Sequence, residues 1–301
     1  MTQPGRGFHI AGTAFPSPKL AAGLYLVATP IGNLGDITLR ALQTLASADL
    51  IACEDTRVSR KLLEHYGIAT PTVAYHDHNA AAVRPGLLKR IAEGAAVAVV
   101  SDAGTPAISD PGFKLVREAR DAGLAVVALP GASSVLAALV SSGLPTDRFL
   151  FEGFLPAKAT QRRERITELA RVPATLVLFE GGSRIAATLH DLAAAFGERE
   201  AAICRELTKL HEEVRRASLP ALAEHYAGDA ETRGEFVVVI APPGEAAAPA
   251  ADDVDALIRA ALTRVSVKDA VGEIVAATGL PRRDVYQRAL ALAKERSDAA
   301  P

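Results

Sequence analysis

The sequence predicts an α/β protein made of two α/β domains and a small helical domain at the C-terminal end. Short, continuously apolar runs alternate with amphipathic helical patterns, which is typical of parallel strands covered on both faces. This rhythm restarts near Thr146, and a chain of 301 residues has room for two or three domains. We expect a first domain over residues 23–147, a second over 148–241, a linker at 242–251 and a helical domain at 252–301.

The composition is that of a folded protein, with 49% hydrophobic and 23% charged residues. The net charge of −2 gives no global sign of a nucleic-acid partner, so any RNA contact would come from local basic patches. Cys53 and Cys204 lack metal-binding spacing, which favours a reducing compartment. No apolar run approaches the about 20 residues of a membrane span. Residues 1–22 lack the apolar segment of a signal peptide. We therefore expect a soluble, cytoplasmic enzyme with a flexible N-terminal tail at 1–22.

Five apolar runs predict the strands of the first domain, at residues 24–28, 50–53, 72–75, 95–100 and 124–129. Helical patterns lie between them. One places leucines on a single stripe over residues 39–45. Another is expected to begin at Ser109, ahead of Asp110 and Pro111, and to end near Gly123. The alternation predicts an open, mostly parallel sheet.

The strands of the second domain are predicted at residues 148–152, 175–180, 201–205, 214–218 and 235–240. Because apolar and polar residues alternate over 214–218, we expect this sheet to be mixed or antiparallel. In the helical domain, residues 266–290 indicate a helix, a turn and a second helix, with a small apolar face formed by Val267, Ala270, Ile274 and Val285. A nucleic-acid-binding helix-turn-helix and an ordinary helical hairpin both fit this pattern.

A polar loop follows each strand of the first domain. The loops read TPIGN at 29–33, CEDTR at 53–57, YHDHN at 75–79, SDAGTP at 101–106 and PGASS at 130–134. One such loop would be an ordinary turn, but ligands bind beyond the carboxyl ends of the strands in open α/β sheets. No Walker or GxGxxG motif is present. Asp102, Ser133 and Ser134 suit an ammonium, a ribose or an amino-acid portion, and Gly104 and Gly131 would let the backbone approach a ligand. The loops favour a small nucleoside ligand without phosphates.

The motifs in these loops, together with later segments of the chain, resemble those of a known protein family. TPIGNLGD, CEDTR, YHDHN, SDAGTPAISDPG and LPGASS, followed by FEGFLPAK, FEGGSR, CRELTK and RGEFVVVI, resemble the ribosomal small-subunit RNA methyltransferase I family, of the tetrapyrrole-methylase fold class. The resemblance implies S-adenosylmethionine as methyl donor, bound in a cleft between two α/β domains. It also implies 2'-O-methylation of a decoding-site cytidine in 16S rRNA of the small ribosomal subunit, and a homodimer. Between Glu180 and Arg184 this chain has Gly-Gly-Ser, where relatives often have larger residues.

The resemblance implies a donor site and a substrate surface. The expected donor-binding residues are Pro30, Ile31, Gly32, Asp102, Ala103, Gly104, Thr105, Pro106, Ser133, Ser134, Phe179, Leu207 and Gly234. The expected substrate-binding residues are Glu54, His78, Asn79, Lys158, Arg162, Arg163, Arg184, Arg282 and Arg283. Methyl transfer from a sulfonium needs no metal, and none is expected.

For catalysis, His76 and Asp55 are candidate proton acceptors, and Arg57 and Lys209 are candidate cationic stabilisers. His76 is the first choice as base, because histidine titrates nearest neutrality. Each of these sites also has a purely structural interpretation. The CEDTR residues could cap a helix, and the histidines could belong to a surface loop. The basic run of Lys158, Arg162, Arg163 and Arg165 could be a solvated helix face. The competing functions are methylation of a small tetrapyrrole and non-catalytic nucleic-acid regulation.

Overall fold

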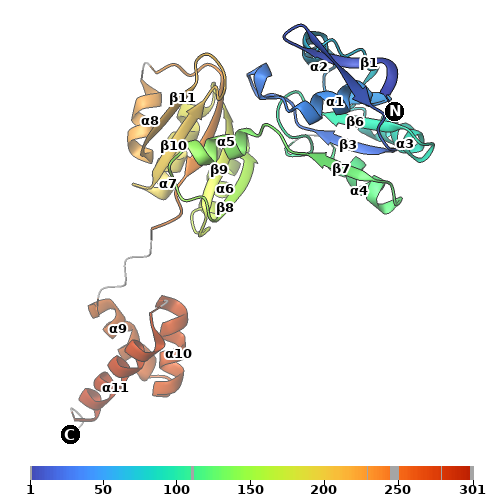
Figure 1. The fold of residues 1–301 in the computed structure, drawn as a ribbon. Coiled ribbons are helices and arrows are strands. Elements are labelled where there is room, and N and C mark those ends of the chain that lie inside the picture. The colour runs from blue at the N-terminus through green and yellow to red at the C-terminus, as the bar shows by residue number, and fades with distance from the viewer. Residues whose placement is uncertain (1, 110–111, 229, 245–250, 279, 299–301) are drawn as a thin grey trace. The chain divides into compact units, whose positions relative to one another are not determined.

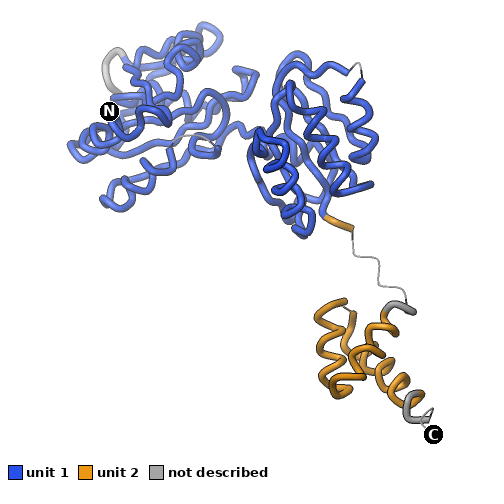
Figure 2. The backbone as a smooth tube through the Cα atoms, turned by 180° about the vertical axis from the view of Figure 1, so that it is seen from behind, with its two compact units in different colours: residues 1–242 blue, residues 243–301 orange. Residues whose placement is uncertain are grey.

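The computed structural model contains two compact units, residues 1–242 and 243–301 (Figure 2). It describes the chain except for residues 1, 110–111, 229, 245–250, 279 and 299–301. Most of the predicted linker at 242–251 therefore lies outside the described residues. Each unit has a hydrophobic core of its own, and each is described by itself.

The first sheet of the larger unit is parallel throughout, as predicted, with the strand order β5-β4-β6-β3-β7. Figure 1 shows β6, β3 and β7 side by side. Its strands are β3 (Gly23–Val27), β4 (Leu50–Cys53), β5 (Thr72–Ala74), β6 (Ala96–Val100) and β7 (Val126–Leu129). Helices α1 (Leu39–Ser47) and α2 (Thr56–His65) pack on one face, and α3 (Ala80–Ala92) and α4 (Phe113–Asp121) on the other. A short 3-10 helix, η1 (Leu34–Asp36), follows β3.

The N-terminal segment is not a flexible tail, and that expectation is wrong. Strands β1 (Thr2–Ile10) and β2 (Thr13–Pro18) form an antiparallel hairpin. Phe8 is buried in the core beneath α1 and α2. The Arg6 guanidinium donates to the carbonyl oxygens of Ser47 and Ala48 at 3.0 and 2.9 Å, and the backbone N–H of His9 donates to Tyr66 O at 2.8 Å. These tertiary contacts hold a segment whose Gly- and Pro-rich sequence has little strand propensity.

Helix α4 begins later than predicted. Its first residue is Phe113 and its N-cap is Gly112, whereas Ser109, the expected start, has a left-handed φ of 56°. Asp110 and Pro111 lie outside the described residues. A Cβ on Gly112 would come within 3.2 Å of Ala107 Cβ, so glycine allows the chain to pass closely here before the helix starts.

The second sheet is mixed, as predicted, with the order β11-β10-β12-β9-β8. Its strands are β8 (Phe149–Phe154), β9 (Thr175–Gly181), β10 (Glu200–Arg205), β11 (Glu213–Ser218) and β12 (Glu235–Ile240). Only β8 and β9 pair in parallel among its described strands. Helices α6 (Ala159–Leu169), α7 (Ile185–Phe196) and α8 (Leu219–Ala227) cover one face.

Helix α5 (Ser134–Ser141) covers the other face of this second sheet, through Val135, Ala138 and Leu139. It lies within the predicted first domain, so the boundary placed at residues 147–148 is too late by one helix. The apolar runs identify strands, but they do not say on which sheet a connecting helix packs.

The C-terminal unit consists, in its described part, of α9 (Ala251–Leu262), α10 (Val267–Thr278) and α11 (Arg282–Asp298). The predicted helix, turn and second helix over 266–290 are confirmed. Ala270, Ile274 and Val285 are buried as expected, and Ile258 of α9 joins them in a common core. No helix in the described part of the chain is long and apolar enough to cross a membrane.

Candidate active site

Three of the polar loops are joined into one block at the carboxyl edge of the first sheet. Thr29 and Gly104 form a two-way backbone bridge with N···O distances of 2.9 and 3.0 Å. The Thr29 hydroxyl donates to Ser101 O at 3.2 Å, and the Thr105 hydroxyl donates to Ala132 O at 3.2 Å. The loops that follow β3, β6 and β7 therefore support one another.

The glycines of these loops bring backbone close to backbone of the same chain. A Cβ on Gly131 would lie 2.7 Å from Ala28 Cβ, and Gly104, at φ 79°, forms the bridge to Thr29. The small size of Gly104 and Gly131 therefore allows one loop to pack against the next.

Gly32 joins this block to the second sheet. A Cβ at this position would lie 2.4 Å from Lys209 Cγ and 3.1 Å from Leu207 O, in the loop that follows β10. In that loop Glu206 and Thr208 both have left-handed backbones, with φ of 49° and 64°. Such conformations are uncommon for residues other than glycine and concentrate at functional sites. The two sheets therefore meet through a close contact of two loops.

Beside this contact lies a pocket of about 260 Å³ with walls from both sheets. Its lining is mainly apolar and includes Ile31, Ile108, Phe154, Phe179, Leu207 and Val237. Phe179 makes edge-to-face contacts with Phe151 and Phe154, at centroid distances of 4.9 and 5.5 Å. The pocket thus offers an aromatic wall of the kind that takes a flat ring.

The floor of the pocket follows from strand register. Val237 of β12 pairs with Phe179 of β9 on one side and with Cys204 of β10 on the other. Residues directly opposite one another in adjacent strands point to the same face of a sheet. These three side chains consequently form a continuous row beneath the pocket.

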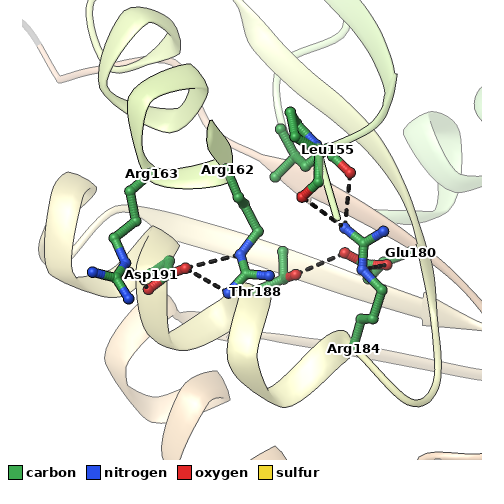
Figure 3. A network of polar contacts seen from close by, with 8 residues as sticks. Leu155, Arg162, Arg163, Glu180, Arg184, Thr188 and Asp191 are labelled. Atoms are coloured by element: carbon green, nitrogen blue, oxygen red, sulfur yellow. Dashed lines mark hydrogen bonds and ion pairs between the residues drawn. The ribbon is translucent and has the colours of Figure 1, made fainter. Parts of the chain in front are cut away.

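Glu180 follows Phe179 at the border of the pocket and is 3% exposed, and its carboxylate points to α7 on the other face of the sheet. The Thr188 hydroxyl and the Gly181 backbone N–H donate to its carboxylate at 2.7 and 2.9 Å, and Arg184 Nε lies 3.2 Å from it (Figure 3). Arg184 also donates to Leu155 O at 2.8 Å. Arg184 therefore fastens the turn after β8 to the carboxylate.

In the Gly-Gly-Ser segment next to Glu180, glycine at position 182 is required for steric reasons. A Cβ on Gly182 would lie 1.7 Å from Thr232 O, so no larger residue fits this backbone. Gly182 therefore allows the chain to pass close to residue 232, whereas a Cβ on Gly181 would meet nothing within 4 Å.

Lys209 is held in the pocket by two carboxylates. Its Nζ donates to Glu206 and Glu235 at 2.8 and 2.9 Å. Burial acts to lower the pKa of Lys209, but the hydrogen bonds to the two carboxylates outweigh it and raise that pKa. The ammonium is consequently charged at neutral pH, and its charge is balanced locally.

A separate polar cluster lies at the carboxyl ends of β4, β5 and β6. The Asp102 carboxylate accepts a hydrogen bond from the Asp55 backbone N–H at 3.0 Å. Burial raises the pKa of Asp102; burial, and after it the charge of Asp102, raises the pKa of Glu54. Asp55 differs, because hydrogen bonds from the side chain and backbone of Arg57 lower its pKa to about 2. Ala103, next to Asp102, lines the pocket, so the cluster borders it.

His76 belongs to this cluster, since it lies close enough to Glu54 to act on the pKa of that carboxyl group. Its Nδ1 is shielded from solvent and has no hydrogen-bond partner among the described residues. Asn79 accepts from the His76 backbone N–H at 2.9 Å and donates to Ala74 O at 2.9 Å, so this side chain shapes the loop. His78 is exposed, with its ring centroid 5.9 Å from that of His76. In the described part of the chain, no group of three or more His, Cys, Asp or Glu is placed to hold a metal ion.

Comparison with known proteins identifies the family. A family model of tetrapyrrole (corrin/porphyrin) methylases matches residues 23–223, and a model of the RsmI C-terminal HTH domain matches 247–293. The chain is 51% identical over 284 residues to ribosomal RNA small subunit methyltransferase I of Mesorhizobium japonicum, covering 94% of this chain and 96% of that one. It is 50% identical to the protein of the same name from Erythrobacter litoralis, over 91% and 96% of the two chains. The chain belongs to this family.

Solved structures support the fold. The cobalamin biosynthetic enzyme cobalt precorrin-4 methyltransferase matches with a TM-score of 0.55 at 20% identity, over 72% of this chain and 94% of that one. Diphthine synthase matches with a TM-score of 0.56 at 19% identity, over 72% and 89%. The predicted tetrapyrrole-methylase fold with an added helical domain is thus confirmed.

Within this fold, the expected donor residues divide into two groups. Ile31, Ala103, Ser134, Phe179 and Leu207 line the pocket. The others lie outside its lining and form the frame around it: Pro30, Gly32, Asp102, Gly104, Thr105, Pro106, Ser133 and Gly234. Sequence reasoning missed Ile108, Ser109, Phe154, Glu180, Gly181, Cys204, Glu235, Phe236 and Val237. The register of β9, β12 and β10 would have found the strand residues among these.

The expected catalytic residues also separate. Asp55, Arg57 and His76 gather at the edge of the first sheet, together with Glu54, whereas Lys209 lies in the pocket. The structure therefore divides the predicted catalytic set between a pocket and an open edge.

The basic run after β8, Lys158, Arg162, Arg163 and Arg165, does not form a continuous surface patch. Arg162 is buried, with Nε and Nη2 at 2.8 and 2.7 Å from Asp191 Oδ2 (Figure 3). Arg165 pairs with Glu152 and Glu168. Lys158 and Arg163 are exposed, and so are Arg282 and Arg283 at the start of α11. Helix α6 therefore buries one of its arginines, Arg162, in an ion pair instead of exposing it.

Proposed function

We propose that this protein transfers the methyl group of S-adenosylmethionine to the ribose 2'-oxygen of a decoding-site cytidine in 16S rRNA. Family membership supports the coarser statement, that the chain is an S-adenosylmethionine-dependent methyltransferase of small-subunit ribosomal RNA. The observation that carries the proposal is the pairing of an apolar nucleoside-sized pocket with an open polar edge along Asp102 and Ala103.

The pocket suits the adenosine part of the donor. Phe154 and Phe179 supply an aromatic wall, and the row under Val237 gives an apolar floor. When bound, the donor supplies a methyl group on a sulfonium, which is open to in-line displacement by an oxygen nucleophile.

The open edge is where the ribose hydroxyl loses its proton. Asp55 is a weak base, because Arg57 holds its pKa at about 2. His76 is only half-buried, and its ring, through the nitrogen other than the shielded Nδ1, remains the better acceptor of the two. Arg57, whose side chain is 86% exposed, is placed to meet the developing alkoxide or a phosphate.

The test of this role is His76→Ala beside the matched control His190→Ala, which changes an exposed histidine of α7. We expect turnover to fall by about 10²–10⁴ in the first variant and to stay near wild type in the second, with unchanged donor affinity in both. Equal turnover in the two variants would assign the proton to another group or to solvent.

The product decides the reaction. Small ribosomal subunits lacking the modification are incubated with labelled donor, digested to nucleosides and analysed by mass spectrometry, with uroporphyrinogen as a parallel substrate. A 2'-O-methylcytidine is expected from the RNA and no label in the porphyrinogen. A methyl group on the cytosine ring would refute the ribose assignment.

The C-terminal unit is the second RNA contact in this proposal. It has its own core, and Arg282 and Arg283 are exposed at the first turn of α11. Deleting residues 243–301 should leave donor affinity unchanged and weaken binding to small subunits. The salt dependence should decrease, since fewer phosphates are neutralised. Equal salt slopes in the full-length and shortened proteins would assign the unit another role.

The proposal includes a homodimer that works in the cytoplasm, where its ribosomal substrate lies. Leu136 and Val140 of α5 support the dimer: they are 52% and 73% exposed, one helical turn apart. Sedimentation of wild type and Leu136→Glu tests it. A monomeric wild-type protein would refute the dimer without affecting the chemistry.

A further inference from the structure

A second hollow, of about 230 Å³, lies between the loop after β5 and the first turns of α3 and α4. Tyr75, Asp77, Arg84, Gly112, Phe113 and Lys114 line it. It shares none of its lining with the larger pocket. It is smaller than the about 300–1,000 Å³ of sites for drug-sized ligands, so it suits one ring system more than a whole cofactor.

The rim of the hollow carries an exposed aromatic side chain. Phe113, in the first turn of α4, is 64% exposed, a high fraction for a phenylalanine. The Arg117 guanidinium lies over its ring, 5.7 Å from the centroid. Lys114 beside it is also exposed. An aromatic face flanked by two cations is the arrangement that stacks a base and contacts the neighbouring phosphates.

The interior of the hollow carries a donor and an acceptor. Arg84 is 15% exposed and its Nε lies 2.8 Å from Glu118, close to the buried Tyr75. A guanidinium has five N–H donors, so these partners leave N–H groups for a ligand carbonyl. Asp77 is exposed and offers a carboxylate acceptor. The edges of nucleobases present both kinds of partner.

Chain connectivity places the hollow beside the catalytic edge. Asp77 directly follows His76, and Tyr75 directly precedes it. A base held in the hollow would therefore belong to a nucleotide near the one whose ribose meets His76. Specific recognition of RNA commonly uses unpaired bases that stack on aromatic side chains.

We infer that this hollow is a subsite for one unpaired nucleobase of the RNA substrate, stacked on Phe113, with Lys114 and Arg117 on its phosphates. The inference rests on the proposed function, because it takes RNA as the substrate. It adds a recognition element outside the donor pocket and the histidine loop.

The test compares full-length Phe113→Ala, Phe113→Leu and Phe113→Trp with wild type. Phe149→Ala serves as the matched control, since Phe149 is 42% exposed on β8. Three quantities are measured: affinity for a labelled oligocytidine of about ten nucleotides, KM for unmethylated small subunits, and donor affinity by calorimetry.

We expect Phe113→Ala and Phe113→Leu to weaken oligocytidine binding and raise the KM by about 5- to 100-fold. Donor affinity should stay at the wild-type value. Phe113→Trp should retain binding because it keeps the stacking face, and Phe149→Ala should behave as wild type.

Wild-type affinity and KM in Phe113→Ala would overturn the subsite, as would a leucine variant that binds as well as the tryptophan variant. A wild-type protein that methylates no small subunit would refute the proposed function instead. In that case oligocytidine binding still tests the hollow by itself.

Discussion

Replacing Arg162 tests whether the basic run after β8 serves stability or RNA binding. The side chains of Arg162 and Asp191 are 9% and 8% exposed, and both Nε and Nη2 contact the same carboxylate oxygen. Arg162→Ala would leave a buried carboxylate with Arg163 as its remaining ion-pair partner, at 3.3 Å. Removing one partner of a buried pair costs about 3–5 kcal/mol. Because Arg163 remains, we expect the lower end, about 3 kcal/mol.

Differential scanning calorimetry of the full-length protein measures this change. For a unit of this size about 1 kcal/mol shifts Tm by roughly 2–4 °C, so the melting of the larger unit should fall by about 6–12 °C. Arg163→Ala is the matched control: its side chain is 67% exposed, and exposed pairs contribute about 0–1 kcal/mol. Combining Arg162→Met with Asp191→Leu should recover most of the loss, because no unpaired charge is then buried.

The decisive second measurement is affinity for small ribosomal subunits well below the melting temperature. Arg162→Ala should bind as wild type, since the guanidinium is not accessible. An unchanged Tm together with weakened RNA binding would contradict this reasoning and would indicate that Arg162 contacts the RNA substrate.

Three further changes probe the frame of the site. The Tm of Glu54→Gln should exceed that of wild type at about pH 7, and this gain should shrink toward about pH 4. The pKa of Glu54 is raised in the folded protein, so ionising this carboxyl group costs stability as the pH rises. A gain in Tm that does not depend on pH would exclude this cause. Gly32→Ala should lower donor affinity by about tenfold in calorimetric titrations, since the added Cβ overlaps the Lys209 loop. Gly86→Ala, where a Cβ meets nothing within 4 Å, should leave that affinity unchanged. Phe8→Ala should cost about 3–5 kcal/mol in chemical unfolding, and a loss below about 1 kcal/mol would mean that the hairpin is not docked.

The strands of both sheets could be predicted because buried strands appear in the sequence as short runs of apolar residues. The residues of β6 are all buried, and the sequence there is Ala-Val-Ala-Val-Val. The hairpin could not be predicted in this way. Strand β1 contains one proline and two glycines before Phe8, and what holds it is the burial of Phe8 and the contacts of Arg6 with the end of α1. Those contacts are tertiary, and local propensity does not contain them.

The position of the site could be predicted, but much of its lining could not. The loops after parallel strands necessarily share one edge of the sheet, so Glu54, His76 and Asp102 come together as their order in the chain requires. The pocket floor depends instead on antiparallel register, which sets Val237 opposite both Phe179 and Cys204. A shift of one residue would turn a different set of side chains toward the pocket.

The two sheets divide the work of the proposed reaction. The second sheet supplies an apolar floor and aromatic wall, and its one lysine in the pocket lining is balanced by Glu206 and Glu235. In the proposed reaction this sheet therefore binds the donor and excludes water, but it provides no side chain that could accept a proton. The titratable groups without such compensation lie on the first sheet, around His76 and Glu54. Substitutions in β9 and β12 should consequently change donor affinity, whereas those after β4 and β5 should change turnover with the donor still bound. The separation follows from which sheet carries the protonable side chains, because binding a nucleoside requires a dry cavity and deprotonating a ribose requires an accessible polar edge.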